Sequence, residues 1–206
     1  MERFSFIIMA VAVVLMLGGT VIMIVRRGHA VGLWTGSAIS GAGYGLASAA
    51  LSRGVDVHLI YYLLVYAIGH AGALAAIRAV GRQRMPVSRL AGLYYRNPAL
   101  CAMTGVFLLS LAGLPPAGGF AAKLLLLFQA ASQGELLATA VMTVCMAVSF
   151  YGYFIFVRWM FMRTGPDDSP IPLPASAAGM LAVMAAALMA MGLFPGQILH
   201  FLGNIL

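Results

Sequence analysis

Residues 110–128 read Ser-Leu-Ala-Gly-Leu-Pro-Pro-Ala-Gly-Gly-Phe-Ala-Ala-Lys-Leu-Leu-Leu-Leu-Phe, an apolar run that two prolines interrupt before a lysine. Proline removes a backbone N–H donor and clashes with the preceding helical turn, so the prolines predict a helix break. The apolar segment from Pro98 to about Ala130 is too long for one straight membrane crossing, and we expect it to form two half-helices. The carbonyls freed by the break must face protein or a hydrated cavity, because lipid cannot satisfy them. The predicted break comprises Gly113, Pro115, Pro116, Gly118 and Gly119.

Lys123 is the only lysine in the sequence, and the other basic residues are arginines in or near predicted loops and span ends. A charged side chain inside the membrane costs about 3 kcal/mol or more. Arginine keeps its charge, whereas a desolvated lysine can alternate between charged and neutral forms. Snorkelling to an interface is the alternative, but a lysine just past the break and followed by Leu124 to Leu127 is poorly placed for it. We therefore interpret Lys123 as a proton carrier.

The composition is that of a multi-span membrane protein. Of the 206 residues, 63% are apolar and 8% are charged, and the mean hydropathy is +1.00. The net charge of +7 comes from arginines near membrane boundaries, so we expect no nucleic-acid binding. Cys101 and Cys145 lie in apolar runs, and no nucleophile constellation, metal-ligand cluster or phosphate loop is present. We expect no enzyme active site, no metal site and no cofactor in this chain.

Apolar runs of about 20 residues predict an all-α membrane protein with a single transmembrane domain over residues 1–206. We expect a bundle of six transmembrane helices, of which the fourth is discontinuous. The glycine-rich second helix is expected to pack inside the bundle. Thr164 to Pro174 is predicted to be an exposed connector, and the residues after Pro195-Gly196 a short amphipathic tail. The predicted spans are about 4–25, 30–51, 58–80, 98–130 with a break at 113–119, 136–156 and 175–194.

The distribution of arginines predicts the orientation, because connectors on the inner side of a membrane are enriched in basic residues. With the N-terminus outside, the outer ends and connectors carry only Arg3 and Arg53. Six crossings then place both termini outside. The inner connectors carry Arg26, Arg27, Arg82, Arg84, Arg89, Arg96 and Arg163.

No predicted span supplies a carboxylate to Lys123, because all five acidic residues lie at the N-terminus or in connectors. An ionisable group inside a membrane normally has a partner or a water-filled path. That partner is His70 in the third predicted span, water, or another chain. A lone histidine on an apolar helix is more often a hydrogen-bonded core residue than a relay, so both readings of His70 stay open.

Four stretches carry a resemblance to the antiporter-like proton-pumping subunits of respiratory complex I. The run from Ser110 through Pro115-Pro116 to Lys123 resembles the broken helix of that family. The similarity is greatest to the smallest such subunit, called subunit 2 in mitochondria and N in bacteria. It extends over nearly the whole chain but covers only the last six spans of the family. The other matching stretches are Tyr62-Leu-Leu-Val-Tyr-Ala67, Ser149-Phe-Tyr-Gly-Tyr153 and Gly192-Leu-Phe-Pro-Gly196.

The resemblance implies a proton-translocating membrane-arm subunit of an NADH:quinone oxidoreductase, in the mitochondrial inner membrane or the bacterial plasma membrane. Lys123 is then part of a half-channel, and lysine at this position favours an N-type or L-type subunit over an M-type one. Ser40-Gly41-Ala42-Gly43-Tyr44 stands where the family has a motif with a histidine, and we expect His70 to replace that histidine. The residues expected to line the channel are Ser40, Tyr44, Ser110 and Tyr151.

The N-terminal half of the family has no counterpart in these 206 residues. A split subunit, a truncated relic and a partial sequence all fit, and we favour a split subunit because a buried lysine is costly to retain in a relic. The expected partners are the N-terminal half as a separate chain, the other antiporter-like subunits and lipids, with quinone bound elsewhere. Rival functions are a multisubunit cation/proton antiporter, a membrane subunit of an energy-converting hydrogenase and a non-pumping structural subunit.

Overall fold

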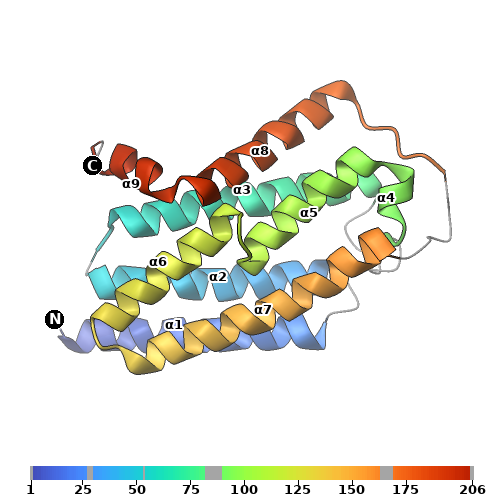
Figure 1. Cartoon of the computed structure of the whole chain (residues 1–206). Coiled ribbons are helices and arrows are strands. Elements are labelled where there is room, and N and C mark those ends of the chain that lie inside the picture. The colour runs from blue at the N-terminus through green and yellow to red at the C-terminus, as the bar shows by residue number, and fades with distance from the viewer. Residues whose placement is uncertain (1, 27–29, 53, 82–89, 163–168, 205–206) are drawn as a thin grey trace.

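The long helices of the chain lie side by side and run roughly along one common direction (Figure 1). The structure is a computed structural model that describes residues 2–26, 30–52, 54–81, 90–162 and 169–204. All regular elements in those ranges are helices. They are α1 Glu2–Val25, α2 Ala30–Ser52, α3 Val57–Val80, α4 Leu93–Arg96, α5 Pro98–Ala112, α6 Gly118–Ser132, α7 Leu136–Met162, α8 Ala175–Leu193 and α9 Pro195–Gly203.

Four helices in the described part of the chain are long and apolar enough to cross a membrane, namely α1, α3, α7 and α8. The helices α5 and α6 are apolar but have only 15 residues each. The helix α2 is 23 residues long, but its glycines and serines make it less apolar than the four. The chain is therefore an all-helical, multi-pass membrane protein.

The helix break lies where the prolines predict it. The helix α5 starts after Asn97, whose side chain accepts a hydrogen bond from the backbone N–H of Leu100. It ends at Gly113, which has a left-handed φ of +84° and donates to the carbonyls of Leu109 and Ser110. The predicted break was two residues too long, because Gly118 and Gly119 form the first turn of α6.

The two half-helices meet in a junction that has room only for glycine. The backbone N–H of Gly119 donates to Oγ of the buried Ser110 at 3.0 Å. A Cβ atom on Gly119 would lie 1.7 Å from the carbonyl oxygen of Ser110. A Cβ atom on Gly192 of α8 would lie 1.9 Å from the carbonyl oxygen of Pro116. The break is thus fixed by close backbone contacts, as is usual between helices in lipid.

Close backbone contacts also join α1 and α2, which lie next to each other in Figure 1. A Cβ atom on Gly36 of α2 would lie 2.6 Å from the carbonyl oxygen of Gly19. A Cβ atom on Gly43 would lie 2.7 Å from the carbonyl oxygen of Ala12. These contacts confirm that the glycine-rich second helix packs inside the bundle.

Three features of the fold differ from the sequence prediction. The helix α7 continues to Met162 instead of ending near residue 156, and its Trp159 carbonyl accepts a hydrogen bond from Gly92 beside α4. The short helix α4 was not predicted. Ile171 is buried, so the connector over residues 164–174 is not exposed throughout, although residues 164–168 lie outside the described part. The carbonyl of Ile171 accepts from the side chain of Asn97 at 3.1 Å.

The beginning of α1 and the end of α9 lie at the same end of the bundle (Figure 1). This arrangement agrees with an even number of crossings. The predicted inner connector with Arg82, Arg84 and Arg89 lies outside the described residues, so the orientation stays a prediction.

Candidate functional site

Lys123 is held at the helix break by the carbonyls that the break sets free. The side chain extends from the second turn of α6 and is 3% exposed. Its Nζ donates to the carbonyl of Leu111 at 2.7 Å and to that of Ala112 at 3.3 Å. Both carbonyls belong to the last turn of α5, where helix carbonyls have no partner in their own helix. We predicted that the freed carbonyls face protein or a hydrated cavity, and these two face protein.

An aromatic ring and a glycine complete the surroundings of Lys123. Its Nζ lies 5.7 Å from the centre of the Tyr44 ring, within the range of a cation–π interaction. The Tyr44 hydroxyl donates to the carbonyl of Met142 on α7, which fixes the ring in place. A Cβ atom on Gly113 would lie 3.0 Å from Cδ of Lys123, so the glycine makes room for the lysine side chain. Among the described residues no carboxylate lies within ion-pair distance of Lys123.

A row of aromatic rings runs from Tyr44 to His70. The ring centroids of Tyr44 and Tyr62 are 6.3 Å apart, those of Tyr62 and Tyr66 are 5.0 Å apart, and those of Tyr66 and His70 are 4.5 Å apart. The Tyr66 hydroxyl donates to the carbonyl of Ser37 at 2.9 Å and also lies 3.1 Å from its Oγ. His70 is therefore connected to the site of Lys123 through tyrosines and not by direct contact.

His70 keeps one ring nitrogen without a partner. Its Nδ1 lies 3.1 Å from the carbonyl of Tyr66, whereas its buried Nε2 has no hydrogen-bond partner. The buried hydroxyl of Tyr153 on α7 is also unpartnered. Buried polar atoms are nearly always hydrogen-bonded, and the usual partner where protein supplies none is an ordered water.

The other predicted lining residues have different surroundings. Ser40 is buried, and its Oγ lies 3.5 Å from Oγ1 of Thr20. Ser110 is buried too, but it holds the junction through Gly119. Tyr151 is 56% exposed and does not face the interior of this chain, whereas Tyr153 is 1% exposed, so the lining role of Tyr151 stays a prediction. The sequence contained the signal for Tyr153, which lies at helical spacing from Met142, Cys145 and Ser149, all of them buried.

The comparisons with known proteins identify the family. Residues 2–150 match the family model described as NADH:quinone oxidoreductase/Mrp antiporter, TM. The chain belongs to this family. It is 33% identical over 211 aligned residues to NADH-quinone oxidoreductase subunit N of Paenibacillus sp. (strain JDR-2). The alignment covers 97% of this chain and 40% of that protein. The chain thus spans about two fifths of the length of this curated relative.

Two solved structures place this antiporter-family fold in known assemblies. A chain of respiratory complex I from Thermus thermophilus with bound aureothin aligns with a TM-score of 0.84 and 31% identity, over 94% of this chain and 44% of that one. A chain of the Mrp complex from Dietzia sp. DQ12-45-1b aligns with a TM-score of 0.82 and 22% identity, over 98% of this chain and 47% of that one. The second likeness shows a shared fold.

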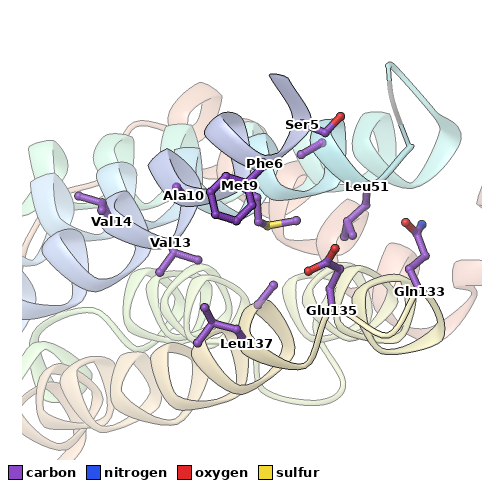
Figure 2. A pocket seen from close by; sticks show the side chains of 12 residues that line it. Ser5, Phe6, Met9, Ala10, Val13, Val14, Leu51, Gln133, Glu135 and Leu137 are labelled. Carbon is purple, nitrogen blue, oxygen red and sulfur yellow. The ribbon is translucent and has the colours of Figure 1, made fainter. Parts of the chain in front are cut away.

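A cavity of about 680 Å³ in this antiporter-family chain lies away from Lys123. It opens between the N-terminal part of α1, the end of α2 and the connection from α6 to α7 (Figure 2). Its walls are mainly apolar, and Figure 2 shows Glu135 extending from the α6–α7 connection toward Leu51. None of the predicted proton-transfer residues lines it, and in the described part of the chain no three His, Cys, Asp or Glu side chains form a group that could hold a metal.

Proposed function

We propose that this chain is a proton-translocating membrane-arm subunit of an NADH:quinone oxidoreductase, the C-terminal half of an N-type antiporter-like subunit. The observation that carries the proposal is Lys123, a buried amine at a helix break whose partners are two backbone carbonyls. An ionisable group at such depth is expensive and marks an ion or proton path in membrane proteins. The family match and the 31% identity to a complex I chain support the same function.

The lengths of the helices support six membrane crossings, as this role requires. Helices of 15 residues are about 22 Å long, which is shorter than the hydrocarbon thickness of about 30 Å, so α5 and α6 cross together as one broken helix. The 23 residues of α2 extend for about 34 Å and suffice for a crossing. The break then falls inside the membrane, and Lys123 with it.

The geometry supports a charge switch at Lys123. The carbonyl end of α5 carries partial negative charge, which stabilises the ammonium form while the junction is closed. A small opening of the junction withdraws the carbonyls of Leu111 and Ala112 and favours the neutral amine. Charge changes in neighbouring subunits would drive the closing and opening of the junction. Lys123 would take up a proton from the central axis of the membrane arm when the junction closes and release it outward when the junction opens. The half-helix ends act as they do in transporters with broken helices.

His70 would deliver protons through water on its unpartnered Nε2 and along the hydroxyls of Tyr66 and Ser37. The variant His70→Gln keeps a hydrogen-bonding side chain but cannot carry the proton, and we expect it to lower proton translocation by roughly tenfold. Proton uptake by liposomes that contain the purified native assembly measures the effect. The matched control is His200→Gln, because His200 is an exposed histidine on α9. Equal rates in the two variants would assign His70 a packing role.

A cation/proton antiporter is the second candidate, because the fold is shared with the Mrp complex chain. The two functions differ in the transported ion and in its driving reaction. We expect NADH and a quinone to change the pH inside liposomes that contain the reconstituted assembly. The rate of this change should stay the same when sodium is replaced by choline. Transport that requires sodium and proceeds without NADH would support the antiporter instead.

The proposed partners follow from the exposed surface of α1 and from the length of the relatives. Phe6, Val14 and Val21 on α1 are each more than half exposed, and α1 borders the cavity of Figure 2. We propose that the N-terminal half of the same pump subunit, the other antiporter-like subunits and lipids cover such surfaces. Redox cofactors and quinone would be bound elsewhere in the assembly.

A further inference from the structure

A hydrogen-bonded group of polar side chains joins three helices at the end of the bundle that is predicted to face outward. Asp56 precedes α3, and its Oδ2 accepts from Nε2 of Gln129 on α6 at 2.9 Å. The same Oδ2 lies 3.3 Å from Nδ1 of His58. The Oε1 of Gln129 accepts from Oγ of Ser48 on α2 at 3.2 Å. Asp56 and His58 are partly exposed, with 25% and 37% of their side chains accessible, so the group reaches from the bundle interior to the surface.

This group lies on the same helices as the Lys123 site. Gln129 follows Lys123 on α6 by six residues, or about 9 Å. On α2, Ser48 follows Tyr44 by one helical turn, and the Tyr44 ring faces Nζ of Lys123. The two helices α2 and α6 therefore connect the buried amine with the partly exposed Asp56 and His58. A proton would need water beside Ser48 to pass from Nζ of Lys123 to this hydrogen-bonded group.

The carboxylate of Asp56 does more than cap a helix. Its Oδ1 accepts from the backbone N–H of Leu59 at 2.9 Å and so caps the start of α3. An asparagine would supply the same cap. The second oxygen faces Gln129 and His58. A carboxylate at this position can bind a proton, whereas the amide of an asparagine cannot.

Few other charged groups face this end of the bundle. The elements that pack against it contribute His200 on α9 and Glu135 before α7, both of them exposed. The helix α1 also begins at this end, with Glu2 and Arg3 as its first residues. Arg53 lies outside the described residues. Among the described residues, Asp56 accepts a hydrogen bond from α6, the half-helix that carries Lys123, and His58 lies next to the same carboxylate oxygen.

We propose that Asp56 and His58 form the outward proton-release site for Lys123, an inference that rests on the proposed function. The ammonium of Lys123 gives its proton to water beside Ser48 and becomes a neutral amine. The proton then binds to the Asp56–His58 pair and leaves from His58 to the water outside. Gln129 and Ser48 are positioning residues that hold the carboxylate at the end of this route.

The test uses the purified native assembly in liposomes and measures the rate of proton translocation during NADH oxidation. Asp56→Asn keeps the helix cap, and the amide of Gln129 can turn over to keep its bond to the new side chain. We expect this variant to assemble normally and to translocate protons about fivefold or more slowly, whereas Asp56→Glu restores at least about half of the rate. His58→Gln should lower the rate by about two- to threefold. Glu135→Gln is the matched control at the same end of the bundle and should behave as the wild type.

The inference and the proposed function fail in different ways. Loss of pumping in Lys123→Ala together with wild-type pumping in both Asp56→Asn and His58→Gln would overturn the release site and leave the pump assignment standing. Equal defects in Asp56→Asn and Asp56→Glu would also overturn it, since a structural clamp and not a proton-binding group would then be at work. If Asp56→Asn does not assemble, wild-type pumping by His58→Gln is the result that overturns the proposal.

Discussion

Replacing Lys123 by alanine abolishes coupled proton translocation while the assembly still forms. We expect the translocation rate to fall to less than about a hundredth of that of the wild type, because the variant lacks the amine that alternates between charged and neutral forms. The carbonyls of Leu111 and Ala112 lose their donor, at a cost of about 1 to 3 kcal/mol per group, but the buried charge is removed as well. Proton uptake by liposomes and the composition of the purified assembly measure the two effects.

Two further substitutions separate charge from proton transfer at this position. Lys123→Arg keeps a positive charge that cannot be given up, so it should also fail to translocate protons. Lys123→Met fills the same space without charge and serves as the control for packing. Normal pumping in the methionine variant would mean that the chain is a structural subunit.

Adding one methyl group at the helix break should destabilise the protein more than any surface substitution. In Gly119→Ala the new Cβ would lie 1.7 Å from the Ser110 carbonyl oxygen, and in Gly192→Ala it would lie 1.9 Å from that of Pro116. Because backbone must move in both cases, we expect a loss of about 3 kcal/mol or more, or a failure to assemble. The yield and thermal unfolding midpoint of the purified assembly measure this loss.

The control for these glycine variants is Gly179→Ala on α8. No atom lies within 4 Å of the position that its Cβ would take, and alanine favours a helix over glycine by about 1 kcal/mol. We expect a midpoint equal to or slightly above that of the wild type. A fall as large as that of Gly119→Ala would show that the effect comes from loss of glycine in general and not from the junction.

The local rules of helix formation predict most of the fold. Pro115 and Pro116 placed the break, and the glycines of the second span predicted that this helix packs inside the bundle. The predicted fifth span ended near residue 156, before the membrane-boundary residues Arg158 and Trp159, but α7 continues to Met162 because a membrane boundary does not end a helix. The sequence had no means of showing α4, which packs beside Trp159 through a contact between distant segments.

The candidate site was predictable in its centre and not in its extensions. A unique lysine after a proline pair predicts a buried amine, and the structure supplies its partners. Tyr151 was chosen over Tyr153 because the motif alone does not say which tyrosine faces inward. Asp56 and Gln129 are 73 residues apart, so the contact between them needed the three-dimensional packing of α3 against α6.

The central claim is that Lys123 changes its charge during turnover, and its nitrogen can be observed directly. Because the chain has one lysine, ¹⁵Nζ-lysine labelling of this chain within an otherwise unlabelled assembly gives a single side-chain signal. The measurement is solid-state NMR of the labelled assembly in membranes, at rest and during NADH oxidation with quinone. The account predicts a resting ammonium signal and a second signal, that of a neutral amine, during turnover. A single ammonium signal that stays the same in both conditions would contradict it.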